Sequence, residues 1–379
     1  MIFFFWLFLF LIFYTYLGYP LVLGIVAALR GRPRPQRDDV LQPVISIVVP
    51  AYNEEKTIVQ KLENLLALDY PKEKLEIVVV SDCSSDRTDD LVRSFEGRGA
   101  RLCRMEKRGG KIAGYKAVLP ELKGEIIVFS DATSKLGLDS LRKLVRNFAD
   151  ESIGCVAGRL QYIDPNKADI ARGEQAYWSY ETRIKQREEK VCSLTSVSGT
   201  FYAVRKELFP MDIDDDLADD LIVVLNCVKN GRRVILETEA VCQEYAIHAD
   251  DAEITKRWRI TVQNLRGLFA MPQMMNVCRY GWYAWMIISH KLFRILVPFF
   301  LLGVLGTNVL IAGRSVFFQM TLLAQIGFYL CGALAAVWQD KRPRLLNIIY
   351  YFCVTNLAIL VGIIRFLKGE RVAVWETAR

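Results

Sequence analysis

Residues 44–55, VISIVVPAYNEE, decide the fold class of this chain. An unbroken apolar run, VISIVVP, leads into a turn, and EEKTIVQKLENLLAL (54–68) follows with the spacing of an amphipathic helix. A short continuous apolar run bounded by a turn predicts a fully buried strand. The stretch therefore predicts a strand, a turn and a helix in direct succession.

The same pattern recurs twice. KLEIVVVSD (74–82) precedes the helical SSDRTDDLVRSF (84–95), and GEIIVFSDATS (124–134) precedes the helical LDSLRKLVRNFA (138–149). Strands that alternate with helices predict βαβ units and a parallel sheet. We therefore expect an α/β domain that is Rossmann-like, with a mostly parallel sheet.

Acidic side chains follow all three predicted strands: Glu54, Asp82 and Asp131. Ligands of open α/β sheets bind at this edge. A single such acid more often caps a helix, but three together favour a site for base, ribose and a divalent metal ion. No GxGxxG or GxxxxGK[ST] follows these strands, which argues against NAD and P-loop enzymes. The negative charge of a phosphate group would then have to be balanced by a metal ion and by side chains such as Lys111.

The two ends of the chain predict a membrane protein. The first 28 residues carry no charged side chain. As a helix that rises about 1.5 Å per residue, this segment is long enough to cross a hydrocarbon core of about 30 Å. A signal peptide would need a basic start, a shorter apolar core and a cleavage site. The basic linker RGRPRPQRDD (30–39) predicts that the next domain is cytoplasmic.

Three further apolar segments, 296–312, 316–338 and 345–366, are candidate spans. Simple alternation places the tail KGERVAVWETAR outside, against its positive charge. A re-entrant segment or a tail lying along the interface would remove the conflict, and both alternatives stay open. The expected organisation is an N-terminal helix (1–29), a linker (30–42), an α/β domain (43–252), interfacial helices (253–286), three C-terminal spans (287–367) and a basic tail (368–379).

Composition excludes several other classes. The nine cysteines form no CxxC pair and there are only two histidines, which suits reduced cytosolic thiols and no ordinary zinc site. The net charge of +7 fits lysines and arginines that flank a membrane. No long basic run with interleaved aromatic residues points to nucleic acid.

Six segments, in order and spacing, resemble the family 2 glycosyltransferases. They are VISIVVPAYNEEKTI (44–58), VVVSDCSSDRT (78–88), GGKIAGYKA (109–117), IIVFSDATS (126–134), GTFYAVRKELF (199–209) and ADDLIVVLNCVKNGRRV (218–234). The membrane-bound branch with the poly-N-acetylglucosamine, hyaluronan and chitin-oligosaccharide synthases looks most similar. Each motif alone is weak, and the resemblance covers residues 43–268.

The resemblance implies a GT-A fold and an inverting transfer from a nucleotide-sugar, commonly a UDP-sugar, with Mg²⁺ or Mn²⁺. It makes Asp219 and Asp220 the catalytic acid pair, with Asp220 as the general base, and it places the acceptor at Gly199 and Thr200 in an acceptor-side loop, SVSGTFYAVR (196–205). The implied donor-binding residues are Ala51, Tyr52, Glu54, Asp82, Lys111, Asp131, Ala132, Arg257 and Trp258. Asp131 also begins the family's DxD motif and is the expected metal ligand.

The reaction explains these residue types. A carboxylate that accepts the proton of the attacking hydroxyl contributes roughly 10² to 10⁴ in rate. A divalent ion stabilises the charge that develops on the leaving diphosphate. The alternative for Asp219 and Asp220 is a solvated acidic loop that caps the following helix.

The sequence departs from the family pattern at two places. Thr133 stands where DxD has its second acid, so Asp131 is expected in a water-rich metal shell, with His248 as a further candidate ligand. The family's QxxRW is reduced to the RW of Arg257 and Trp258, which makes long-chain polymer synthesis doubtful. The alternative reading of residues 256–269 is a basic amphipathic helix on the membrane surface.

The predicted function is transfer of a sugar to a glycan or polysaccharide at the cytoplasmic membrane face. Transfer to a lipid carrier or glycolipid is the alternative, and a non-catalytic component of a synthesis complex or a transporter ranks lower. The expected partners are the nucleotide-sugar, the acceptor and membrane lipid, with a second copy or an export protein as further candidates.

Overall fold

The computed structural model describes residues 1–163, 169–245, 250–337 and 343–374, and the chain divides into two compact units. We call them the sheet domain and the helical unit. The sheet domain is drawn from Val26–Ile247, Arg266–Met274 and Arg371–Arg379, and the helical unit from Met1–Ile25, His248–Leu265 and Met275–Glu370.

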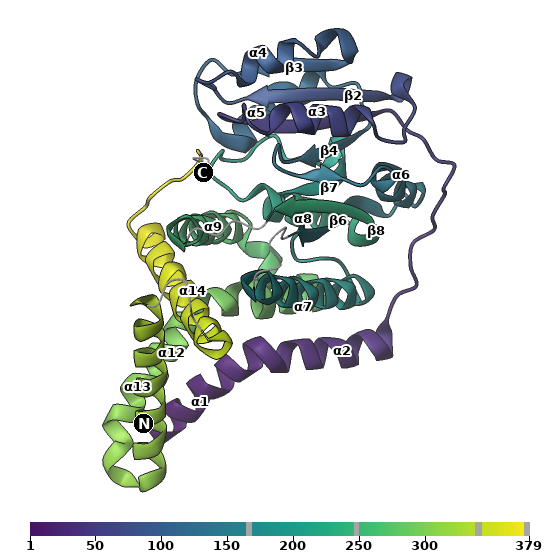
Figure 1. Ribbon diagram of the computed structural model, residues 1–379. Coiled ribbons are helices and arrows are strands. Elements are labelled where there is room, and N and C mark those ends of the chain that lie inside the picture. The colour runs from purple at the N-terminus through teal and green to yellow at the C-terminus, as the bar shows by residue number, and fades with distance from the viewer. Residues whose placement is uncertain (164–168, 246–249, 338–342, 375–379) are drawn as a thin grey trace. The chain divides into compact units, whose positions relative to one another are not determined.

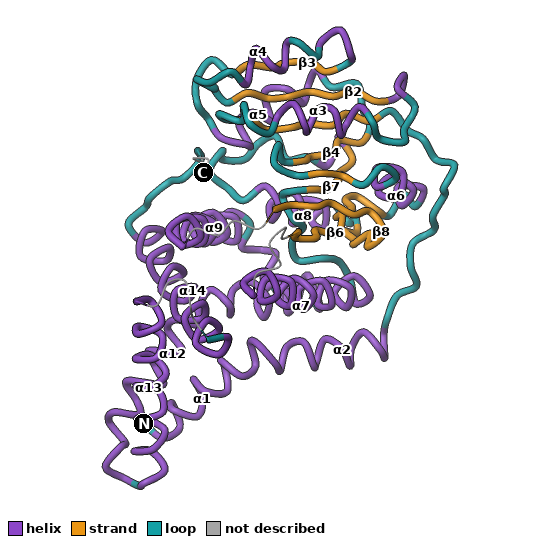
Figure 2. The backbone as a smooth tube through the Cα atoms, in the orientation of Figure 1, coloured by secondary structure: helices purple, strands orange, loops and turns teal. Residues whose placement is uncertain are grey.

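The described strands of the sheet domain form one sheet, in the order β3-β2-β1-β4-β7-β6-β8-β5 (Figure 2). The strands are β1 (Ile45–Ala51), β2 (Leu75–Ser81), β3 (Ala100–Arg104), β4 (Ile126–Ser130), β5 (Lys135–Leu136), β6 (Ile153–Ile163), β7 (Phe201–Arg205) and β8 (Arg233–Tyr245). Strands β3, β2, β1 and β4 pair in parallel, and the sequence predicts three of them, β1, β2 and β4. Strand β7 runs antiparallel to β4 and β6, and β8 is parallel to β6 and antiparallel to β5. The sheet is therefore mixed.

Helices cover both faces of this sheet (Figure 1). Side chains alternate along β1, so that Ile47 and Val49 lie in one core and Val48 lies in the other. Both cores are fully covered, which explains why the strand reads as a continuous apolar run. The first core includes α3 (Ile58–Leu66), α4 (Thr88–Arg93) and α6 (Ser140–Val145), and the second includes α5 (Gly110–Val118) and α8 (Asp219–Lys229).

The remaining helices are mostly longer and more apolar. They are α1 (Ile2–Phe13), α2 (Tyr19–Arg30), α7 (Asp169–Val191), α9 (Asp250–Ala270), α10 (Val277–Tyr280), α11 (Trp282–Met286), α12 (Phe293–Ile311), α13 (Val316–Val337) and α14 (Arg344–Leu367). Short π-helical turns join α1 to α2 (Tyr14–Gly18) and α11 to α12 (Ile287–Leu292).

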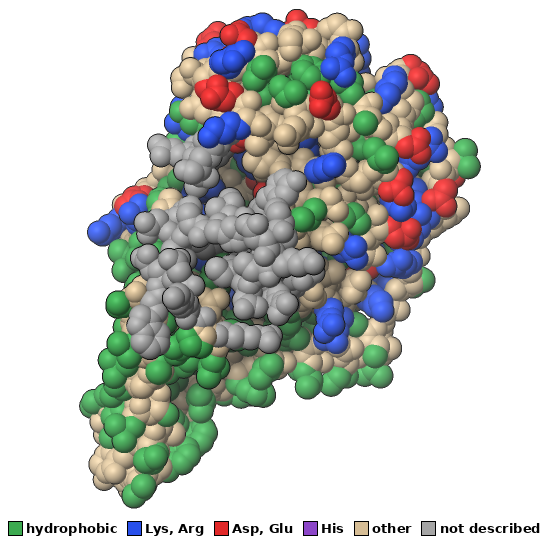
Figure 3. Space-filling model, viewed as in Figure 1, with side chains coloured by type: hydrophobic (Ala, Val, Ile, Leu, Met, Phe, Trp, Pro, Cys, Tyr) green, Lys and Arg blue, Asp and Glu red, His purple; other side chains and the backbone are tan. Residues whose placement is uncertain are grey.

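Four helical segments in the described part of the chain are long and apolar enough to span a membrane. They are Ile2–Arg30, Trp282–Arg314, Val316–Val337 and Leu345–Leu367. Large apolar side chains such as Phe3 and Leu334 are 70% and 63% exposed there. Figure 3 shows hydrophobic side chains crowded over these helices and charged side chains scattered over the sheet domain. The second segment begins at Trp282, earlier than the predicted 296, because one continuous helical path runs through the polar residues of the π-turn.

Candidate active site

The loops that follow β1 and β2 are tied to each other at the carboxyl edge of the sheet. Asn53 adopts a left-handed backbone conformation (φ 52°), and its N–H donates to Ser84 Oγ at 3.1 Å. The Glu54 N–H donates to Thr88 Oγ1 at 2.7 Å. The Glu54 carboxylate is 5% exposed and accepts a hydrogen bond from Thr57 Oγ1 at 2.5 Å. Glu54, one of the expected donor-binding residues, therefore also holds the start of α3.

Asp82 and Tyr52 both contact the loop that leads into α5. Asp82 is 2% exposed and accepts the N–H groups of Gly109 at 2.7 Å and Gly110 at 3.1 Å. Gly110 has a φ of +86°, a conformation that favours glycine. The guanidinium of Arg108 lies 3.6 Å from the centre of the Tyr52 ring. Asp82 thus orients this loop, and Arg108 is a neighbour that sequence analysis missed.

Lys111 and Asp131 form an ion pair across the edge of the sheet. The Lys111 ammonium, in the first turn of α5, lies 2.5 Å from Asp131 Oδ1. The Asp131 N–H donates to the carbonyl of Thr200 at 3.2 Å, which brings the predicted acceptor segment to the same place. Ala132 and Thr200 are buried. Segment 196–205 is expected as a loop, but its second half, Phe201–Arg205, forms β7, and Gly199 and Thr200 precede this strand in a turn.

Asp219 lies at the start of α8, against the acceptor segment. A Cβ on Gly199 would be 3.8 Å from both of its carboxylate oxygens, and the Tyr202 hydroxyl donates to Asp219 Oδ2 at 3.1 Å. Burial raises the pKa of Asp219 to about 6, Lys111 opposes this, and Asp220 and Asp131 add to it. The structure therefore groups Lys111, Asp131 and Asp219 in one electrostatic cluster.

This raised pKa predicts a pH-dependent stability. Asp219 keeps its proton more readily when folded, so its contribution to the free energy of unfolding is present below about pH 4 and is lost as pH rises through about 6. Asp219→Asn removes the ionisation and keeps an acceptor for Tyr202. We expect its melting temperature to exceed that of the wild type by roughly 2–4 °C at about pH 8 and by much less at about pH 4.5. Equal differences at both pH values, or the same profile for the exposed Asp212→Asn, would contradict this.

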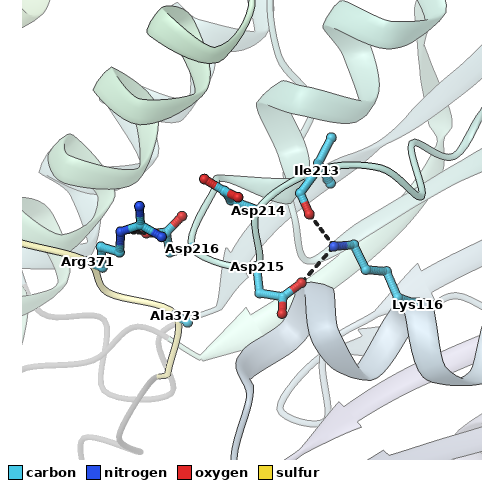
Figure 4. A pocket seen from close by; sticks show the side chains of 7 residues that line it. All are labelled: Lys116, Ile213, Asp214, Asp215, Asp216, Arg371 and Ala373. Carbon is cyan, nitrogen blue, oxygen red and sulfur yellow. Dashed lines mark hydrogen bonds and ion pairs between the residues drawn. The ribbon is translucent and has the colours of Figure 1, made fainter.

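An acidic loop and the C-terminal segment border the cluster. A cavity of about 340 Å³ is lined by Lys116, Ile213, Asp214, Asp215, Asp216, Arg371 and Ala373 (Figure 4). Lys116 points from α5 to Asp215, with 2.8 Å between the charged atoms. Asp216 is 4% exposed and pairs with Arg266 Nε at 2.8 Å. These contacts fix the loop that ends at Asp219 and Asp220.

Two predicted donor residues lie in the helical unit. Arg257 donates to the Tyr351 hydroxyl at 3.1 Å, and Arg365 stacks over the Trp258 ring at 4.0 Å. Both contacts join α9 to α14 within the helical unit. His248 lies outside the described residues.

The residues around Asp131 suit a hard divalent cation. Thr133 donates to Glu244 Oε1 of β8 at 3.3 Å, which adds a carboxylate to the turn where DxD has its second acid. Carboxylate oxygens are the donors that Mg²⁺ and Mn²⁺ prefer. In the described ranges no three His, Cys, Asp or Glu side chains already form a ligand cluster. The carboxylate oxygens of Asp131 and Glu244 fit a divalent metal ion, and Glu244 was missed because it is distant from Asp131 in the sequence.

Comparison with known proteins gives this edge of the sheet a chemical context. The Glycosyl transferase family 2 model matches residues 46–210, which include β1 to β7 and the Lys111–Asp131 pair. The chain carries a family 2 glycosyltransferase domain. The enzyme class inferred from the six segments is thereby confirmed.

Curated relatives of this domain are named for different products. The chain is 29% identical over 199 residues to the beta-monoglucosyldiacylglycerol synthase of Trichormus variabilis, covering 50% of this chain and 42% of that protein. It is 27% identical over 206 residues to the poly-beta-1,6-N-acetyl-D-glucosamine synthase of Staphylococcus aureus, covering 52% and 49%. The matched part spans less than half the length of each relative. One is named for a glycolipid product and the other for a polysaccharide.

A solved structure confirms the GT-A glycosyltransferase fold. The mannosyltransferase PcManGT from Pyrobaculum calidifontis, in complex with GDP-Man and Mn²⁺, superposes with a TM-score of 0.73. The match covers 97% of this chain and 100% of that chain at 21% sequence identity. At this identity the likeness concerns the fold.

Proposed function

We propose that this glycosyltransferase moves a sugar from a nucleotide-sugar, a UDP-sugar in the first instance, to a hydroxyl group of a membrane-associated glycan. The observation that carries the proposal is the Lys111–Asp131 ion pair beside Asp219, at the edge where the three β-strand loops meet. A cation and carboxylates at one edge suit a diphosphate, a metal ion and an acceptor hydroxyl together.

In the proposed reaction Asp220 accepts the proton of the acceptor hydroxyl as its oxygen attacks the anomeric carbon. The bond from that carbon to the diphosphate oxygen breaks as the new bond forms, so the configuration inverts. Lys111 meets the negative charge that leaves with the nucleoside diphosphate. Asp131 would hold a divalent cation, which would supply Lewis-acid stabilisation of the same charge. Asp219, which accepts a hydrogen bond from Tyr202, orients the neighbouring Asp220.

A second candidate acceptor is a lipid. Arg257 and Trp258 make their contacts with α14, and the Gln that precedes RW in polymer-forming relatives is Ile254 here. Transfer of one sugar to a lipid carrier or glycolipid fits these residues. In either case we place the sheet domain on the cytoplasmic face, because the basic linker at 30–39 follows the first apolar helix.

The test uses the full chain in lipid nanodiscs. Release of nucleoside diphosphate is measured from a panel of UDP- and GDP-sugars with Mg²⁺, Mn²⁺ or EDTA, and with membrane lipid or oligosaccharide as acceptor. Release from one donor only, dependent on the metal, supports the proposal. The mobility of the labelled product then separates a glycolipid from a longer glycan. Nucleotide binding without any transfer, across all donors and acceptors, would contradict it.

A further inference from the structure

One lysine is buried inside the sheet domain. Lys61 lies in α3 and is 2% exposed, and the side chains around it on the same helix, Ile58, Leu62 and Leu65, belong to the hydrophobic core. Removing an ammonium group from water costs several kcal/mol unless its surroundings compensate it. An apolar side chain at this position would stabilise the core more than an ammonium group does. Core packing therefore does not explain why a lysine is found here.

All three protons of the Lys61 ammonium are directed at the two ends of the turn that carries Asp131. Its Nζ lies 2.7 Å from Ser130 Oγ, 2.9 Å from the Ser134 carbonyl oxygen and 2.9 Å from Ser134 Oγ. Ser130 is the last residue of β4, directly before Asp131, and Ser134 ends the turn. Lys61 therefore clamps residues 130 and 134 together from inside the domain.

The clamp continues to Asp131 itself. Ser134 Oγ donates to the Asp131 carbonyl at 2.8 Å, and the Ser134 N–H donates to the same oxygen at 3.2 Å. The two serine hydroxyls are also 3.1 Å apart, so they can bond each other without the lysine. The turn thus needs no ammonium for hydrogen bonding alone, and what Lys61 adds is a fixed charge and a fixed geometry.

The charge lies in the field of the neighbouring acids. Burial lowers the pKa of Lys61 to about 8, while Cys242, Asp131 and Glu244 oppose that decrease. Asp131 and Glu244 are the carboxylates that flank Thr133 at the candidate metal site. Lys111 pairs with Asp131 directly, whereas Lys61 acts on it through the turn.

We propose that Lys61 is a positioning residue for the divalent-cation site, which it builds by holding the Ser130–Ser134 turn so that the Asp131 carboxylate is preset for the metal–diphosphate. This inference rests on the proposed function, because it takes Asp131 as the metal ligand. Groups behind a metal ligand orient it, and their loss typically costs about 10- to 100-fold in metal affinity.

The experiment measures Mn²⁺ binding rather than turnover. The full chain in nanodiscs is titrated with Mn²⁺ in the presence of saturating UDP or GDP, and free Mn²⁺ is followed by electron paramagnetic resonance. Lys61→Met is expected to raise the Kd for Mn²⁺ by about 10- to 100-fold. Nucleotide binding in EDTA should stay unchanged.

The matched control is Lys206→Met, which removes a partly buried lysine that donates to the Leu122 carbonyl at 2.6 Å, on another part of the domain. It should leave the Kd for Mn²⁺ unchanged. The double variant Lys61→Met with Asp131→Asn should bind Mn²⁺ no more weakly than Asp131→Asn alone, because both act on one ligand. Independent, additive losses would overturn the inference.

The remaining outcomes separate this inference from the proposed function. Unchanged Mn²⁺ binding in Lys61→Met, or an equal loss of nucleotide binding in EDTA, would show that Lys61 only fills the core. Unchanged Mn²⁺ binding in Asp131→Asn would overturn the metal site itself, and the inference with it. If Lys61→Met does not fold, Ser134→Ala decides: it removes one acceptor of the ammonium and should weaken Mn²⁺ binding in the same direction, and no change would count against the clamp.

Discussion

Asp220→Asn is expected to lower the turnover of sugar transfer by roughly 10² to 10⁴, the usual contribution of a general base. Asparagine has nearly the same shape but cannot take the proton of the acceptor hydroxyl. Donor affinity should stay close to that of the wild type, because the predicted donor contacts lie outside the segment that carries Asp219 and Asp220. Single-turnover release of nucleoside diphosphate, with donor binding measured separately, checks both parts.

The control for this substitution is Asp212→Asn, an exposed acid in the same segment of the chain. This substitution should change turnover little, since an exposed carboxylate in solvent takes no part in the proton transfer from the acceptor hydroxyl. A loss confined to Asp219→Asn would assign the base to Asp219, whose carboxylate faces Gly199. Equal turnover in all three variants would contradict an acidic base in this loop.

Glu237→Gln is expected to destabilise the sheet domain by about 3 kcal/mol. Glu237 is fully buried in β8, and its carboxylate lies 2.8 Å from Arg37 and 3.2 Å from Arg146. The Asn147 amide donates to it at 3.1 Å. Removing the negative charge leaves the buried side of the Arg146 guanidinium without its compensating partner. The cost lies at the low end for a broken buried pair because Arg146 also contacts Asp39 and Glu239.

The measurement is the melting temperature of the full chain in detergent, which should fall by roughly 6–12 °C for Glu237→Gln. Glu239→Gln is the matched control. Glu239 pairs with the same Arg146 at 2.7 Å but is 48% exposed, so its loss should change the free energy of unfolding by less than about 1 kcal/mol. Similar decreases for the two variants would show that burial does not decide the strength of this network.

The candidate membrane spans and most strands of the parallel half of the sheet could be predicted, because both leave a local signal. A span reads as about 20 apolar residues, and a strand buried on both faces reads as a short apolar run between turns. The acids that follow these strands, such as Asp82 and Asp131, come to one edge by the rule that parallel strands end together. Six motifs in register were enough for the enzyme class.

The remainder of the site depends on contacts between distant segments. The sequence predicts a loop where β7 forms. GTFYAVR becomes a strand only by pairing with β4 and β6, and such pairing leaves no periodic signal in a short segment. Glu244 reaches Thr133 across more than a hundred residues of chain. Asp82, one of the expected donor-binding residues, accepts hydrogen bonds from the Gly109 and Gly110 N–H groups, and the sequence alone does not show this contact.

The sequence by itself determined that this chain has an α/β domain of the family 2 glycosyltransferase type between apolar helices, with carboxylates at one edge of the sheet. Only the tertiary structure decided how those carboxylates are held. Lys61 shows the difference: in the sequence it is an ordinary lysine in an amphipathic helix, and in the fold it is buried under the Asp131 turn. Burial and long-range hydrogen bonds belong to the folded chain, because they arise where segments meet and not within any one of them.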